Sequence, residues 1–171
     1  MLLVWQRQLV GSLFKLVFSP YTFTKEQILV EQIHVNGKCH CGNVSISGSV
    51  DANMIIACHC TDCQTFSGAP FRAVVIMTRE NITIDGDVFE YTKVAESGNE
   101  RVQGFCGVCG TQVYARAPDG SVYNVRTGFL EQHKSLAPVK HIFAKSKAPW
   151  IDTIGEAIWH EAGPASKQVK P

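Results

Sequence analysis

Seven cysteines in three short clusters constrain this 171-residue sequence more than any other feature. The densest cluster is the run Cys-His-Cys-Thr-Asp-Cys, which begins at Cys58 and ends at Cys63. A tight turn brings side chains at these spacings together around one point, where three thiolates bind zinc and leave its fourth position free. The run therefore predicts an open zinc site held by Cys58, Cys60 and Cys63.

The other four cysteines form two pairs, Cys39 with Cys41 and Cys106 with Cys109. Together the two pairs supply the four ligands of a closed, tetrahedral zinc site. We expect this site to be structural, because it joins segments far apart in the sequence whose ligands are not gathered in the unfolded chain. The cysteines thus divide into four and three with none left over, which predicts two zinc ions per chain.

The alternative interpretation is a set of disulfides, or a mixture of buried and free thiols. An odd number of cysteines leaves a disulfide framework with one thiol over. Cysteines separated by one residue also meet disulfide geometry only with strain. The spacings therefore favour metal over disulfides.

The cellular compartment follows from the same chemistry. Zinc thiolates persist where thiols stay reduced, and no convincing secretory signal is visible, so we expect a cytoplasmic protein.

Length and charge narrow the class of protein further. A chain of 171 residues suits one domain with a continuous core, and 45% hydrophobic residues are typical of a globular protein. Lys and Arg number 16 against 15 Asp and Glu, so the sequence has no excess of positive charge to attract nucleic acid. We expect no nucleic-acid partner.

Residues 1–34 differ from the rest of the sequence in the spacing of their apolar residues and form a predicted extension. Apolar side chains recur there at spacings of three and four, at Leu2, Trp5, Leu9, Leu13 and Leu16. This pattern predicts an amphipathic helix that Pro20 ends. Polar residues interrupt every apolar run, so no membrane span is expected. The helix is either docked on the domain, an organellar targeting or membrane-surface segment, or the result of a start codon placed too far upstream.

From residue 35 on, short alternating segments separated by Gly, Asn and Asp predict β-strands. The expected strands are 44–50, 54–57, 71–77, 81–84, 88–92, 101–105, 111–117, 121–127 and 139–144. Residues 64–70 are interpreted as a tight loop or a single helical turn closed by Gly68. We therefore expect an all-β domain over residues 35–163, clamped by metal, and a frayed tail over residues 164–171.

The histidines give weaker signals than the cysteines. His40 and His59 each lie between two cysteines of a cluster, where extended backbone turns them away from the metal, so we expect them to support the ligands or to face solvent. His141 lies on a predicted strand and either lines a pocket or caps the core. No Ser-His-Asp order, nucleotide-binding loop or pair of carboxylates is visible, which leaves the three-cysteine cluster as the candidate reaction centre.

Three blocks of the sequence resemble the glutathione-dependent formaldehyde-activating enzyme family, which also includes centromere protein V. The blocks are Gly37 to Val44, Cys58 to Gln64 followed by Ser67 to Pro70, and Phe105 to Thr111. All seven cysteines are in register, and the resemblance runs from about Gly37 to Trp150. It implies an all-β, tent-like fold of antiparallel sheets.

The resemblance also implies roles for the two clusters. It implies a structural zinc at the four paired cysteines, Cys39, Cys41, Cys106 and Cys109, and a catalytic zinc at the three-cysteine run. The implied activity is that of a carbon–sulfur lyase whose reverse reaction joins glutathione and formaldehyde to S-hydroxymethylglutathione. Glutathione is then the expected small-molecule partner.

This chemistry agrees with the residues. A thiol that enters the open zinc position loses its proton, and an aldehyde held beside it gains from proximity. A fourth thiolate makes the centre negative, and backbone amides around Gln64, Ser67 and Gly68 are the expected donors and substrate contacts. The alternative is a non-catalytic zinc-binding β module that binds a protein partner or glutathione. A reachable metal position favours the enzyme, whereas cysteines buried without a pocket favour the module.

Overall fold

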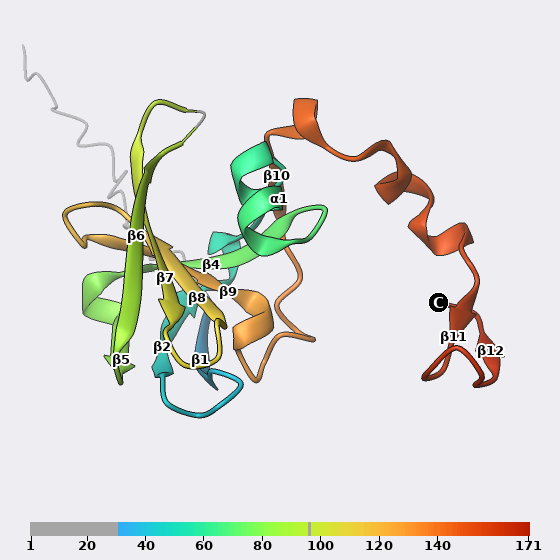
Figure 1. Cartoon of the computed structure of the whole chain (residues 1–171), viewed down its shortest axis with the longest axis horizontal. Helices are drawn as coiled ribbons and strands as arrows, with labels where there is room; N and C mark the ends of the chain where they lie inside the picture. The colour runs from blue at the N-terminus through green and yellow to red at the C-terminus, as the bar shows by residue number, and fades with distance from the viewer. Residues whose placement is uncertain (1–30, 96) are drawn as a thin grey trace, which may run out of the picture.

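A computed structural model describes residues 31–95 and 97–171 (Figure 1). The predicted N-terminal helix lies outside these residues. The described chain is mostly β-structure, as expected. Its strands are β1 (Gln32–Lys38), β2 (Ser45–Asp51), β3 (Ile55–Cys58), β4 (Arg72–Thr78), β5 (Ile82–Asp85), β6 (Val88–Val94), β7 (Glu100–Cys106), β8 (Gln112–Arg116), β9 (Val122–Arg126), β10 (Lys140–Ile142), β11 (Trp159–His160) and β12 (Gln168–Val169).

The larger of the two main sheets contains seven of the described strands, in the order β10-β3-β4-β9-β8-β7-β6. Its neighbouring strands pair antiparallel except at one edge, where β10 runs parallel to β3. The expectation of purely antiparallel sheets is wrong at this edge. The reason is the long connection from β9 to β10, because only a long connection can bring a strand back to pair in parallel with another.

The smaller sheet, β1-β2-β5, lies against the larger one, with β2 in contact with β4. Alternate residues of β4, Val75 and Met77, join Val35 and Ile46 of the smaller sheet in the core. Each such side chain contributes about 1.5–3 kcal/mol by leaving water. The core occupies one face of β4, and the residues between, such as Val74, project from its opposite face, where the candidate site lies.

The segment between β3 and β4 forms α1 (Thr61–Ser67), the one α-helix in the described part of the chain. Cys60 caps its first turn, because the Cys60 sulfur accepts the Cys63 amide at 3.4 Å. Gly68 ends the helix with a left-handed φ of 62°, which favours glycine. The sequence predicted only a loop or one turn over residues 64–70. The helix begins earlier because its cap lies inside the cysteine run.

Short 3₁₀ helices complete the described chain. Their bounds are η1 (Ala52–Met54), η2 (Arg79–Asn81), η3 (Thr127–Phe129), η4 (Ala144–Ser146) and η5 (Pro149–Glu156). After β10 the chain leaves the sheets through η4 and η5 and ends in the hairpin of β11 and β12 (Figure 1). Within the described residues, no helix is long and apolar enough to cross a membrane.

Candidate metal centres

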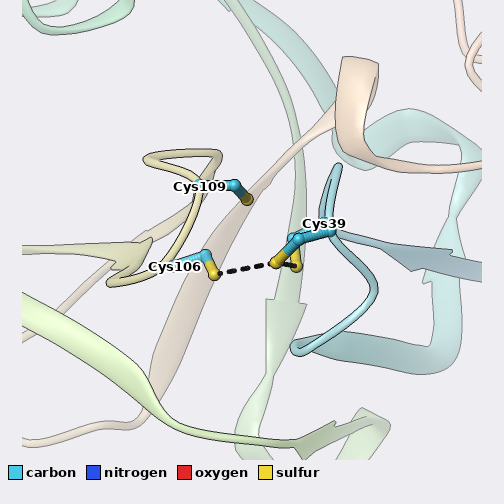
Figure 2. Close-up of side chains that lie close together, drawn as sticks. Cys39, Cys106 and Cys109 are labelled. Carbon is cyan, nitrogen blue, oxygen red and sulfur yellow. Dashed lines mark hydrogen bonds between the residues drawn. The ribbon is translucent and has the colours of Figure 1, made fainter.

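The first centre lies where the loop after β1 meets the tip of the β7–β8 hairpin (Figure 2). Cys39 and Cys41 come from the loop, whereas Cys106 ends β7 and Cys109 precedes β8. The four sulfur atoms lie within 4.8 Å of one another. The Cys41 sulfur is 3.5 Å from that of Cys39 and 3.7 Å from that of Cys106. The structure thus brings together the four cysteines that the sequence grouped.

These separations fit a tetrahedral metal site. Sulfur ligands about 2.3 Å from zinc lie about 3.8 Å apart in a regular tetrahedron, whereas the sulfur atoms of a disulfide are about 2.0 Å apart. All seven cysteines of the chain belong to the described residues, and all are free. The geometry favours metal over the disulfide alternative.

Local hydrogen bonds favour the thiolate form of Cys39 and Cys109 at this centre. The Gly110 amide donates to the Cys106 carbonyl at 2.9 Å and closes a turn with a φ of 71° at Gly110. The amide of Val44 donates to the Cys39 sulfur at 3.2 Å. Hydrogen bonds from the hydroxyl and the amide of Thr111 lower the pKa of Cys109 to about 5. The thiolate is the form that binds metal.

The second centre joins the end of β3 to the first turn of α1. Cys58 ends the strand, Cys60 caps the helix and Cys63 lies within it. The three sulfur atoms lie within 4.8 Å of one another, and those of Cys58 and Cys60 are 3.6 Å apart. In the described chain no histidine, carboxylate or further cysteine joins this group. Three thiols fit a metal that keeps one position open, and this donor set suits zinc.

A cavity of about 280 Å³ lies beside the three cysteines, all of which line it. One wall is the face of the large sheet opposite the core, with Ile56 and Val74. Ile142 and Phe143 form an apolar side next to the cysteines. The loop between β6 and β7 contributes polar residues to the lining, including Asn99. The cysteines are buried, yet they border a space that a small molecule can fill.

Two arginines lie on the same face of the sheet as Cys58. Arg72 of β4 is directly opposite Cys58 of β3, and Arg126 of β9 is directly opposite Val74. Directly opposite residues project from one face of a sheet. Both guanidinium groups donate to the Gln103 Oε1 atom, each at 3.3 Å. Burial, and then the charge of Arg72, lowers the pKa of Arg126 to about 9.

The charge of Arg72 acts on the thiol next to it. The hydrogen bond from Cys63 lowers the pKa of Cys58 to about 6, and the positive charge of Arg72 contributes to this shift. Cys58 is therefore the first thiolate of the group as the pH rises. Burial raises the pKa of Cys60, whose sulfur still accepts the amide of Cys63.

His59 lies between two cysteines of the second centre in the sequence and contacts His141. Its side chain is fully buried, and its Nε2 atom lies 2.9 Å from the Nδ1 atom of His141. Burial lowers the pKa of His59 and favours the neutral ring. His40 is exposed in the loop of the first centre. Neither His40 nor His59 belongs to a ligand group, in agreement with the sequence pattern.

Comparison with known proteins places the chain in a family. The family described as "Glutathione-dependent formaldehyde-activating enzyme" matches residues 34–146, a span that includes both cysteine centres. The chain belongs to this family. A crystal structure of a Rhodobacter sphaeroides protein is similar, with a TM-score of 0.49 and 19% sequence identity over 62% of this chain and 98% of that chain.

The predicted substrate contacts, Gln64, Ser67 and Gly68, do not line the cysteine cavity. The Gln64 side chain donates to the carbonyls of His59 and Ser146, at 2.7 and 2.8 Å. Ser67 donates to the Cys63 carbonyl at 2.6 Å and lines a second cavity, of about 550 Å³. Gly68 ends the helix. Contact of these residues with a substrate stays a prediction.

The sequence reasoning missed Arg72, Arg126 and Gln103. A signal was present for Arg72, because it begins a largely apolar strand at a position that alternation places with the buried Val74. A charged residue on a buried face is uncommon unless it is paired. The pairing partner, Gln103, is 31 positions from Arg72, so spacing alone did not reveal the group.

Proposed function

We propose that this protein is a zinc-dependent carbon–sulfur lyase of the S-hydroxymethylglutathione synthase type. Family membership supports the class of reaction. The observation that carries the proposal is the position of Cys58, Cys60 and Cys63, which border a cavity instead of being enclosed in packed side chains. In the fold, the four-cysteine centre acts as a zinc clamp on a tent-like pair of sheets.

The proposed reaction adds a thiol to formaldehyde. A carbon–sulfur bond forms, the carbonyl π bond breaks, and the proton lost by sulfur is regained by the oxygen, so atoms and charge balance. When bound, zinc supplies a Lewis-acidic position that favours the thiolate form of the incoming thiol. The three cysteines hold that position at the cavity wall, and the neighbouring arginine offsets negative charge.

The cavity favours this proposal over the non-catalytic module. Its volume of about 280 Å³ is at the small end of ligand sites, which suits a thiol group and formaldehyde and leaves the rest of glutathione outside. The apolar side formed by Ile142 and Phe143 limits water next to the thiols. Limited water favours addition of sulfur over hydration of the aldehyde.

An exchange experiment at equilibrium tests the proposal. Glutathione, formaldehyde and their adduct are mixed at neutral pH, and the exchange rate is measured by NMR with zinc-loaded wild type, with Cys60→Ser and with buffer. We expect wild type alone to exceed the buffer rate. If wild type binds glutathione but exchanges no faster than buffer, the lyase proposal fails and a glutathione-binding module replaces it.

The proposal also divides the chain. Residues 35–163 form the zinc-binding domain, with residues 1–34 as an extension and 164–171 as a tail. In the structure β1 already begins at Gln32, and β12 lies in that tail. Removal of residues 1–30 leaves β1 intact, and the truncated protein should retain its zinc content, as metal analysis would check.

The proposal includes a compartment. The protein acts in the cytoplasm, where thiols stay reduced.

A further inference from the structure

Arg72 and Arg126 are two buried cations on one face of the large sheet. Only 9% of Arg72 and 6% of Arg126 is exposed. The register of β3, β4 and β9 places both on the face that carries Cys58. Each arginine is thus close to a candidate metal ligand, and the two positive charges are close to each other.

The two guanidinium groups are incompletely paired. Both donate to the single Gln103 Oε1 atom, which is neutral. The Nε atoms of both arginines, and Nη1 of Arg126, are buried with no hydrogen-bond partner. In the described chain no carboxylate forms an ion pair with either arginine, and Arg126 otherwise lies 5.6 Å from the ring centre of Phe66. Buried charges ordinarily have a partner of opposite charge.

The thiolates balance the charge of the arginines but do not satisfy their unpaired N–H groups. Three cysteine thiolates and the thiolate of the ligand around one divalent cation carry two negative charges, equal in number to the two arginines. The Nε atoms of both arginines and Nη1 of Arg126 still have no acceptor. A carboxylate offers two acceptor oxygens for such groups, whereas the hydroxyl group of a neutral ligand offers one.

The space beside the arginines is suited to such a ligand. A second cavity, of about 550 Å³, is lined by both Arg72 and Arg126 and by no Asp or Glu. Neutral polar residues, among them Thr111 and Thr127, also line it. Arg72 lines the cysteine cavity as well, so it borders both spaces. A molecule with a sulfur atom at the cysteines therefore has a cation within reach of its other end.

We propose that Arg72 and Arg126, held together by Gln103, form a carboxylate-binding site for the thiol ligand whose sulfur lies at the three-cysteine centre. The planar guanidinium group matches a carboxylate through two parallel hydrogen bonds. The inference rests on the proposed function for the position of the sulfur. It adds the residues that recognise the carboxylate end of the thiol.

Three thiols of similar size test this site. At the end opposite the thiol, 3-mercaptopropionate carries an anionic group, 2-mercaptoethanol a neutral group and cysteamine a cationic group. Their dissociation constants from zinc-loaded full-length protein are measured by calorimetry. The cobalt-substituted protein reports whether sulfur reaches the metal, by its absorption spectrum. We expect the anionic thiol to bind at least about tenfold more tightly than the neutral one, because each charge-assisted hydrogen bond adds to its affinity.

The decisive quantity is the ratio of the anionic to the neutral dissociation constant, because sulfur binding largely cancels from it. In Arg126→Met and in Arg72→Met the ratio should fall to within about twofold of unity, as expected when a charge-assisted pair is lost. Arg79→Met is the matched control, since exposed Arg79 lines neither cavity and should keep the wild-type ratio. Arg126→Lys, which keeps charge but not the planar fork, should give an intermediate ratio.

Folding does not obscure the result. Removal of a poorly paired buried charge should leave the melting temperature unchanged or raise it. A measurement without a variant also serves: propionate should compete with 3-mercaptopropionate for wild type, and 1-propanol should not. Equal affinities of wild type for the anionic and neutral thiols, or an unchanged ratio in both arginine variants, would overturn the site. Loss of exchange activity with the charge preference retained would refute the lyase and leave the site standing.

Discussion

Cys58 and Arg72 lie directly opposite each other on the antiparallel strands β3 and β4, so a thiol and a guanidinium group project side by side from one face of the large sheet. The pair links the metal centre to the sheet that supports it. Cys58 is a ligand candidate, and Arg72 is a nearby charge that favours its thiolate form. This relationship gives the three-cysteine centre a definite pH dependence.

Loss of the Arg72 charge should make the second centre release metal at a higher pH. The pKa of Cys58 is lowered to about 6, first by the bond from Cys63 and further by Arg72. Its thiolate is present above that pKa and is lost as the pH falls through it, so protons displace metal on acidification. In Arg72→Met the pKa of Cys58 rises, and release should begin at a higher pH. Zinc release monitored with a chromogenic chelator checks this, with Arg79→Met as the control that should behave as wild type.

The two centres should differ in how readily they lose metal. Purified protein should contain two zinc ions per chain, and a chelator should remove the one held by three cysteines first, because it has one protein ligand fewer and borders a cavity. Metal analysis during chelator treatment, with thiol titration alongside, follows both steps. A content near one zinc, or release of both in a single step, would contradict the division of the cysteines into four and three.

An ion pair across three strands should stabilise the β6–β7–β8 region. Arg116 donates to both carboxylate oxygens of Glu90, at 2.7 and 2.5 Å, and Tyr114 donates to Oε1 at 2.8 Å. Between them on β7 stands Gly104, whose lack of a side chain leaves room for the Tyr114 ring. Arg116 lowers the pKa of Glu90, so its contribution is present above the ordinary carboxyl pKa and is lost as the pH falls through the lowered value.

Glu90→Gln should therefore reduce the free energy of unfolding at pH 7 by about 1 kcal/mol or less, since solvent screens the pair. The difference from wild type should shrink as the pH falls below about 4.3. Urea unfolding at several pH values measures it. Exposed Glu131 provides the control, because Glu131→Gln should leave the curve near that of wild type. A difference that grows on acidification would show that the pair does not act in this way.

Spacing in the sequence predicted the two ligand groups well because each depends on short-range geometry. Cys58, Cys60 and Cys63 meet through one turn, and the two pairs of the other centre each lie in a tight loop. The strands were predicted because short apolar or alternating segments, such as residues 71–77, are separated by turn residues. These features need no knowledge of distant partners.

The features that the sequence did not predict depend mostly on contacts between distant segments. The parallel pairing of β10 with β3 follows from the path of a long connection, which no local pattern encodes. The helix α1 begins early because the sulfur of Cys60 caps it. The sequence spacing had assigned this sulfur to metal binding only. The arginine group comes from β4, β7 and β9, so it appears only when the strand order is known.

Single substitutions should separate a clamp from a reaction centre. Cys106→Ser removes a ligand from the centre that joins the loop after β1 to the β7–β8 hairpin. We expect a large fall in the melting temperature, because zinc binding at a closed site contributes directly to the free energy of folding. Cys60→Ser should leave a folded protein that lacks the more labile zinc, because its neighbours are joined by the continuous segment from β3 to α1.

Circular dichroism melting and zinc analysis of both variants, side by side, distinguish the two roles. Addition of excess zinc should restore part of the melting temperature of Cys106→Ser, since three ligands of that centre remain, but should not restore thiol exchange to Cys60→Ser. An equal loss of stability in the two variants would mean that the three-cysteine centre also holds the fold together. In that case the cavity beside it would be a by-product of a structural site, and the enzyme proposal would lose its main support.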